Sequence, residues 1–147
     1  MPSRSGSYPG DVNVLGARIV AQLIDLVAMF FLMVAVIVTL VGLLPVTDPA
    51  EAEFLGVVTF VGVALGYGTL LEGRYGKTLG KMAMNVRVVS RDGREIHYGQ
   101  AFGRNIPALF GGWPTWLVGM ATIAVNDDNQ RLFDKASDTY VIRDTGQ

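Results

Sequence analysis

Three polar side chains share one stripe at the start of a long apolar segment. Arg18, Gln22 and Asp25 occur within the sequence ARIVAQLIDLV. On an α-helix, Gln22 falls about 40° from Arg18, and Asp25 falls about 20° from it on the other side. A charge inside a membrane costs at least about 2.5 kcal/mol, so Asp25 must face protein or water and needs a partner. Because both H⁺ and Na⁺ neutralise a carboxylate, Asp25 could also serve cation/proton exchange.

Arg18 is a poor partner for Asp25. Their Cα atoms are about 10.5 Å apart along the helix axis, and the arginine side chain leans toward the N-terminus. We therefore predict that Arg104 or a bound monovalent cation lies near Asp25. We also predict that Asp134 lies near Arg18. Arg18, Asp25, Arg104 and Asp134 form the candidate functional charge cluster, with Gln22 in a supporting position.

Three apolar segments must position these charges, at about residues 19–44, 54–72 and 106–126. Each supplies most of the roughly 20 apolar residues that an α-helix needs to cross a bilayer. Prolines and a Gly-Gly pair interrupt the third segment. The order Asp48-Pro49 predicts that the second helix begins near Pro49. The sequence thus predicts an all-α membrane protein of about three transmembrane helices, the third kinked or re-entrant.

The polar segment 73–103 is predicted to add a small cytoplasmic β-hairpin and an interfacial helix. Basic residues flank Leu and Met within Gly76–Met84, which favours a short helix on the membrane surface. Val86–Val89 and Arg94–Tyr98 flank an Asp-Gly pair, which is a strong hairpin signal. His97 would then lie in the second strand as a solvated side chain.

Lysine and arginine counts predict the orientation. Residues 45–53 contain three acids and no base, whereas residues 72–103 contain six bases. By the positive-inside rule, the N-terminus and the loop 73–103 face the cytoplasm in a multi-pass protein of the cell membrane. We expect this basic loop to contact anionic lipid headgroups. The side of the C-terminus stays open, because three full spans would put it outside and a re-entrant third segment would return it.

Composition excludes several classes of site. The chain has 147 residues, no cysteine and one histidine, which excludes disulfides, cysteine-ligated metals and multi-histidine metal sites. Only 17% of its residues are charged, against about 25% in a soluble domain. A net charge of −1 gives no drive toward nucleic acid. No nucleophile–base set or cofactor loop occurs in the sequence, so we expect no enzyme, no cofactor and no metal site.

One membrane domain is expected over residues 15–142. Residues 1–14 are rich in Gly, Ser and Pro and are predicted to be a disordered tail, while residues 143–147 form a short C-terminal tail. Within the domain, Gly62 and Gly66 give the second helix a small-residue face that lets another helix approach closely. We expect this face to pack on the first helix, with a homodimer seam as the alternative.

Four motifs occur along the chain in a characteristic order. They are Arg18 with Asp25, then Gly76–Val89 followed by Asp92-Gly93, then Ala101–Asn105, then Arg131–Asp134 with Thr139 and Val141. Together they resemble the RDD family of small membrane proteins, which is named for an arginine and two aspartates. The resemblance covers about Leu15 to Ile142 and makes Asp134 the second aspartate. It implies a role that leans toward transport, including sodium–proton exchange for some members.

Two functions stay open at this point. In the first, the chain is a small transporter or cation/proton exchanger that uses the charge cluster, with Asp25 as the ion site. In the second, it is a non-transporting membrane adaptor or scaffold, in which the same cluster fixes how the segments dock. Substitution separates the two, because an exchanger that loses the charge of Asp25 would keep its fold and lose its ion dependence.

Overall fold

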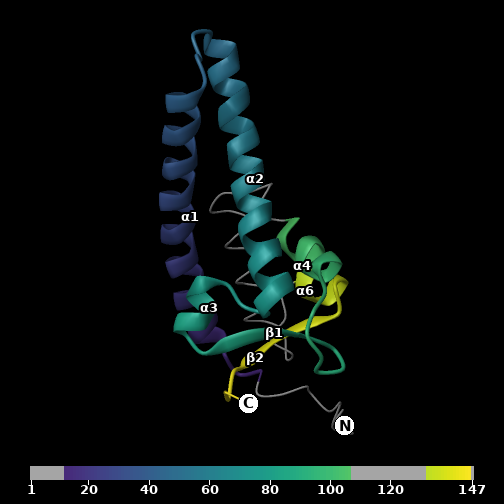
Figure 1. Ribbon diagram of the computed structural model, residues 1–147. Helices are drawn as coiled ribbons and strands as arrows, with labels where there is room; N and C mark the ends of the chain where they lie inside the picture. The colour runs from purple at the N-terminus through teal and green to yellow at the C-terminus, as the bar shows by residue number, and fades with distance from the viewer. Residues whose placement is uncertain (1–11, 107–131, 147) are drawn as a thin grey trace, which may run out of the picture.

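Two long helices stand side by side, and a layer of short elements lies at one end of the pair (Figure 1). The computed structural model describes residues 12–106 and 132–146. We call the layer of short elements the base; it consists of α3, β1, α4, α6 and β2. In chain order, the described elements are α1 (Leu15–Leu43), α2 (Pro49–Tyr75), α3 (Leu79–Ala83), β1 (Val86–Ser90), α4 (Tyr98–Asn105), α6 (Leu132–Ala136) and β2 (Thr139–Arg143).

Local sequence determines both ends of α2. Oδ1 of Asp48 accepts a hydrogen bond from the backbone N–H of Ala50 at 2.9 Å, and Pro49 is the first residue of the helix. At the other end, Gly76 has a φ of 68°, a left-handed conformation that glycine adopts without steric cost. The predicted start of the second helix at Pro49 is confirmed, and the turn at Gly76 directs the chain into the base.

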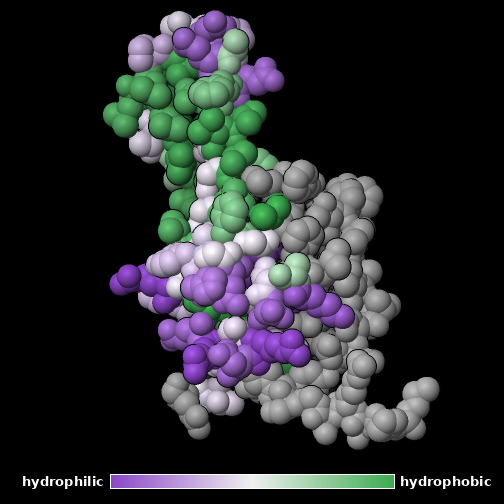
Figure 2. All heavy atoms as spheres, turned by 90° about the vertical axis from the view of Figure 1, so that its right-hand side faces the viewer, coloured by the Kyte–Doolittle hydropathy of each residue, from purple (hydrophilic) through white to green (hydrophobic). Residues whose placement is uncertain are grey.

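The long helices carry an exposed apolar band. We define this band as residues 26–43 of α1 and 54–71 of α2, which have no charged side chain. Each stretch of 18 residues is about 27 Å long at 1.5 Å per residue, close to the ~30 Å of a hydrocarbon core. Figure 2 shows the band as a hydrophobic zone between a hydrophilic tip and a hydrophilic base. Both helices are long and apolar enough to cross a membrane.

Two sequence predictions fall largely outside the described residues. Apart from Ile106, the third apolar segment, 106–126, is not described, so its kinked or re-entrant course stays a prediction. The same holds for most of the tail predicted over residues 1–14. The described C-terminal part nevertheless pairs with the base, because β2 runs antiparallel to β1. Residues 139–143 and the loop 73–103 therefore lie at the same end of the α1–α2 pair.

The predicted hairpin is wrong in its second strand. β1 pairs with β2, from Val86 opposite Arg143 to Ser90 opposite Thr139. A turn does follow β1, where the N–H of Gly93 donates to the carbonyl of Ser90 at 2.9 Å. Beyond that turn only a single bridge, between Val89 and Glu95, continues the pairing.

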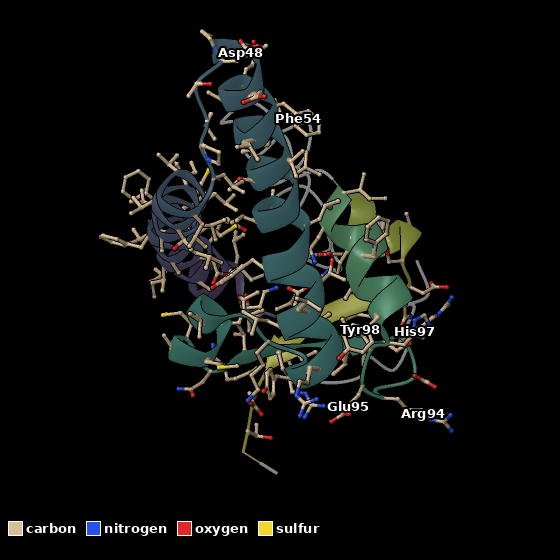
Figure 3. All side chains as sticks on the ribbon, turned by 45° about the horizontal axis from the view of Figure 1, so that its top comes forward. Asp48, Phe54, Arg94, Glu95, His97 and Tyr98 are labelled. Carbon is tan, nitrogen blue, oxygen red and sulfur yellow. The ribbon has the colours of Figure 1, made fainter. Side chains whose placement is uncertain are left out.

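Helix capping at His97 explains why the hairpin stops. Nδ1 of His97 accepts from the N–H of Gln100 at 3.2 Å, and Oε1 of Gln100 accepts from the N–H of His97 at 3.3 Å. This reciprocal pair is a capping box, and it begins α4 where the second strand was expected. Figure 3 shows His97 and Tyr98 together at the start of that helix. His97 is thus a helix cap, which corrects its predicted place in a strand.

A small apolar core joins the sheet to the helices. Val86 and Val88 of β1 and Val141 of β2 are buried against Ala101 of α4 and Val14 before α1. The alternating burial of β2 puts Thr139 and Val141 on the inner face. The core of the base thus also includes Val14, which lies more than 100 residues before Val141 in the sequence.

The glycine face on α2 does not make the expected close contact within the described part of the chain. A Cβ atom added to Gly62 or Gly66 would meet no described atom within 4 Å. Both glycines instead line an open apolar groove between α1 and α2, together with residues such as Leu40 and Val58. The glycines of α2 with close neighbours are Gly68, which lies against the side chain of Asn105, and Gly73, which lies against Tyr98. The close packing of α2 is thus against α4, and it does not involve the predicted face of Gly62 and Gly66.

Candidate functional site

Asp134 joins three elements through two buried arginines. Nη2 of Arg18, from α1, lies 2.7 Å from Oδ2 of Asp134 in α6. Nη2 of Arg104, from α4, lies 2.8 Å from Oδ1 of the same carboxylate. The side chains of Arg18 and Asp134 are each 2% exposed. One carboxylate therefore holds α1, α4 and α6 together, with a different guanidinium on each oxygen.

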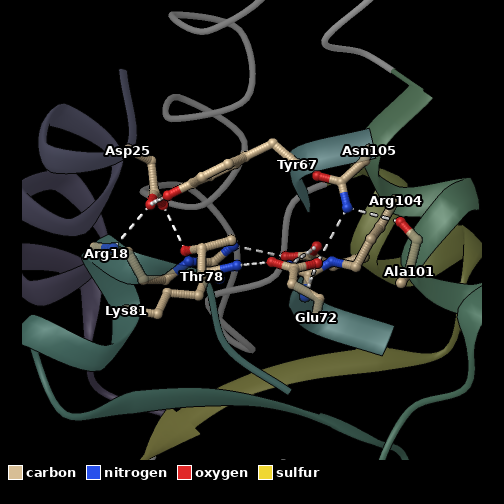
Figure 4. Close-up of polar contacts among 11 residues, drawn as sticks. Arg18, Asp25, Tyr67, Glu72, Thr78, Lys81, Ala101, Arg104 and Asn105 are labelled. Carbon is tan, nitrogen blue, oxygen red and sulfur yellow. Dashed lines mark hydrogen bonds and ion pairs between the residues drawn. The ribbon is translucent and has the colours of Figure 1, made fainter. Parts of the chain in front are cut away.

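Glu72 extends this network to α2 and α3. It is 2% exposed and accepts a hydrogen bond from Nδ2 of Asn105 at 3.1 Å. Nη1 of Arg104 lies 3.4 Å from the same oxygen, Oε2, and Lys81 forms an ion pair with Oε1. Figure 4 shows Asn105 between Glu72 and the carbonyl of Ala101, to which it also donates. Glu72 thus connects the end of α2 to both neighbouring elements of the base.

The electrostatic balance favours a charged Arg104. Burial lowers the pKa of its guanidinium, but Asp134 and Glu72 more than offset this effect, so the pKa lies above its usual value. Arg104 therefore keeps its charge, because a guanidinium is hard to deprotonate and two carboxylates face this one. Arg104 is therefore the common partner of the two acids.

Asp25 has a different environment, made of uncharged donors. Its Oδ1 accepts from the hydroxyl of Tyr67 at 2.7 Å and from the backbone N–H of Gly80 at 2.8 Å. Its Oδ2 accepts from the hydroxyl of Thr78 at 2.5 Å. Figure 4 shows Asp25 pointing from α1 toward Tyr67 and Thr78. Asp25 therefore fastens the first turn of α3 to α1 and α2.

These side chains form one layer at the edge of the apolar band. Asp25 directly precedes the band on α1, and Glu72 directly follows it on α2. We call the set the polar layer; its members are Arg18, Asp25, Tyr67, Glu72, Thr78, Lys81, Arg104, Asn105 and Asp134. Its acids and bases come from α1, α2, α3, α4 and α6. The layer thus separates the apolar band from the small core of the base.

Comparison with known proteins identifies the family. A family model described as the RDD family matches residues 12–138, which is most of the 147-residue chain. The chain belongs to the RDD family. The RDD family is a family of membrane proteins, and α1 and α2 are its candidate membrane-spanning helices in this chain. Searches of curated proteins and of solved structures found no match.

The RDD chain brings together Arg18, Arg104 and Asp134 of the predicted charge cluster, and one of the predicted pairs forms. Arg18 and Asp134 are paired as expected. Of the two partners predicted near Asp25, Arg104 is wrong, because α3 packs on α1 and covers Asp25 with Thr78 and Gly80. A monovalent cation bound near Asp25 stays a prediction. Since α4 packs on α2, its arginine is directed to Glu72 and Asp134 instead.

One central residue of the RDD chain was missed by the sequence analysis. Glu72 directly follows an apolar run, which made it resemble the first residue of a loop. A charge count gave no signal for it, because the predicted cluster of Arg18, Arg104, Asp25 and Asp134 was already neutral. The supporting residue Gln22 lies half-buried on α1, one turn from Asp25. Arg131 of the terminal motif lies outside the described residues.

The three acids of the polar layer are held by protein donors. Each of the six carboxylate oxygens of Asp25, Glu72 and Asp134 accepts at least one contact from a protein donor. Within residues 12–106 and 132–146, no group of three or more His, Cys, Asp or Glu side chains could hold a metal ion. In the described geometry, a cation at any of these oxygens would have to share it with a protein donor or displace that donor.

Proposed function

We propose that this RDD protein is a membrane-embedded scaffold or adaptor that does not transport ions. In this role, the polar layer fixes the base at the end of the two membrane helices and presents its outer surface to a partner. The observation that carries the proposal is that every carboxylate oxygen of Asp25, Glu72 and Asp134 already contacts a protein donor.

The arrangement of the elements supports the same role. The ion pairs of the polar layer join five elements, α1, α2, α3, α4 and α6. Each pair therefore helps to hold the base against α1 and α2. Breaking a buried ion pair by removing one partner typically costs about 3–5 kcal/mol. A network of this kind favours one arrangement of the elements, whereas a transport cycle needs at least two.

We infer that the base faces the cytoplasm. The loop between α2 and α4 carries the Lys and Arg excess, whereas the connection between α1 and α2 carries only acids. Because β2 pairs with β1, this orientation puts residues 139–143 on the cytoplasmic side as well. A cysteine placed after Asp144 would then react with a membrane-impermeant thiol reagent only in inverted vesicles.

Ion flux in reconstituted vesicles tests the scaffold proposal. The full chain, the variant Asp25→Asn and protein-free vesicles are compared for proton movement driven by Na⁺, K⁺ or Li⁺ gradients. The scaffold proposal predicts that both proteins match the protein-free vesicles. Sodium-driven proton movement by the wild type that disappears in the folded variant would contradict it.

Cation/proton exchange is the second candidate, and one observation favours it. Asp25 forms no ion pair with any residue in the described ranges, and its donors are two hydroxyls and one backbone N–H. Hydroxyl groups can turn to accept as well as donate, so Tyr67 and Thr78 could tolerate a protonated or cation-bound Asp25. If the flux experiment detects exchange, Asp25 is the residue to which this alternative assigns the ion.

A further inference from the structure

An arginine and two tyrosines form an exposed patch at the lower end of α2. Cζ of Arg74 lies 5.6 Å from the centre of the Tyr75 ring, and its Nε donates to the Tyr75 hydroxyl at 3.2 Å. Tyr98 of α4 packs over Gly73, where an added Cβ atom would lie 2.9 Å from Cγ of the ring. Tyr75 is 54% exposed and Tyr98 is 48% exposed. Two large aromatic rings and a guanidinium therefore share one accessible surface.

The depth of this patch matches the headgroup layer of a bilayer. Leu71 is the last residue of the apolar band, so Arg74 and Tyr75 lie about 4.5 and 6 Å beyond it along α2. Headgroups add roughly 5–7 Å to each side of the hydrocarbon core. Phe102, one turn after Tyr98 on α4, is 47% exposed and continues the apolar surface. The patch is thus continuous with the lipid-facing band and lies where phosphate groups are found.

Arg74 is also distinguished by its charge environment. Among the bases of the loop 73–103, Lys77, Lys81 and Arg94 form ion pairs with Asp144, Glu72 and Asp92. Arg74 has no ion pair with any described residue and is exposed. Arg87 and Arg91 follow in β1 and the turn after it, further along the base. Arg74 is therefore the base of this loop closest in sequence to the apolar band.

We propose that Arg74, Tyr75 and Tyr98 form a binding site for the phosphate of an anionic phospholipid headgroup. A guanidinium matches a phosphate with two parallel hydrogen bonds, which an ammonium group cannot reproduce. Tyrosine side chains suit the same depth, because the ring contacts acyl chains while the hydroxyl reaches polar groups. This site is independent of the scaffold proposal, since either a scaffold or an exchanger could carry it.

Lipid selectivity of the full chain tests the site. The wild type is reconstituted in phosphatidylcholine vesicles that contain spin-labelled phosphatidylglycerol or spin-labelled phosphatidylcholine, and the motionally restricted fraction of each label is measured. The matched control is Arg94→Gln, which removes the same charge from an exposed side chain on the turn after β1. Figure 3 shows Arg94 pointing away from the helices, whereas Tyr98 lies beside the end of α2.

The expected result is a loss of selectivity confined to the patch. Arg74→Gln should lower the preference for phosphatidylglycerol roughly three- to fivefold, while Arg94→Gln leaves it unchanged. Arg74→Lys should recover only part of the preference, because lysine restores the charge without the planar fork. Thermal melts confirm that each variant is folded. The proposal is overturned if Arg74→Gln keeps the wild-type preference, or if Arg94→Gln loses as much of it.

Discussion

The backbone of Gly80 lies directly against the carbonyl group of Ala21. A Cβ atom on Gly80 would be 2.7 Å from the carbonyl carbon of Ala21 and closer still to its oxygen. Because the neighbouring atoms belong to the backbone of α1, no flexible side chain can move to make room. The close approach also lets the N–H of Gly80 reach Asp25 at 2.8 Å. One glycine thus positions α3 against α1 and completes the environment of Asp25.

Gly80→Ala is expected to destabilise the protein strongly. The added methyl group must push α3 away from α1, at a cost of about 3 kcal/mol. Thermal unfolding in detergent, followed by circular dichroism, measures the effect. Gly16→Ala is the matched control, because a Cβ atom there meets no described atom within 4 Å. Equal melting temperatures for the two variants would contradict this close contact.

Asp134→Asn and Asp25→Asn are expected to differ, although they make the same chemical change. At Asp134, one oxygen becomes an NH₂ group that faces a guanidinium, which should cost about 3–5 kcal/mol. At Asp25, the new NH₂ group can donate to the Thr78 hydroxyl, so the cost should stay below about 1.5 kcal/mol. Equilibrium unfolding in mixed micelles compares them. A larger loss of unfolding free energy for Asp25→Asn than for Asp134→Asn would contradict the different environments assigned to the two aspartates.

Glu72→Gln is expected to loosen the contact of α2 with α3 and α4. The variant replaces one carboxylate oxygen with an NH₂ group beside Lys81 or Arg104 and removes the negative charge that both cations face. We expect a loss of about 3 kcal/mol and faster hydrogen exchange in α4. Glu53→Gln, at an exposed position near the start of α2, is the control and should change little. Unchanged exchange rates in α4 would argue against a linking role for Glu72.

The ion pair between Lys77 and Asp144 should give stability that depends on pH. The hydrogen bond from Lys77 holds the pKa of Asp144 below its usual value. A depressed carboxyl pKa contributes stability above the unfolded pKa of about 3.9, and this stability is lost as pH falls through the folded pKa. Wild type should therefore exceed Asp144→Asn in melting temperature at neutral pH, by a small margin typical of surface pairs. This difference in melting temperature should disappear in strong acid. A difference that grows as the pH falls would contradict a stabilising ion pair at Asp144.

Local patterns predicted those parts of the fold that depend on neighbouring residues. The apolar runs gave α1 and α2, and Asp48-Pro49 gave the start of the second helix. The need of buried charges for partners predicted the pairing of Arg18 with Asp134 across more than 100 residues. These predictions succeeded because a charge at the edge of a membrane helix has few alternatives.

Predictions failed where the outcome depended on competition between distant segments. The Asp-Gly signal correctly marked a turn after β1, with Gly93 at a φ of 80°. It could not reveal that Thr139–Arg143 competes for the same edge of β1, or that His97 starts a helix. Likewise, the partner of Arg104 depends on which helix α4 packs against. Sequence spacing within a single segment carries no information about that choice.

Sodium dependence of thermal stability tests the central claim most directly. A cation that binds the folded state raises its melting temperature by mass action. If protein donors occupy the carboxylates of the polar layer, replacing Na⁺ with choline at constant ionic strength should leave the melting temperature of the full chain unchanged. A sodium-specific increase that is present in the wild type and absent in Asp25→Asn would contradict the account and identify Asp25 as a cation site.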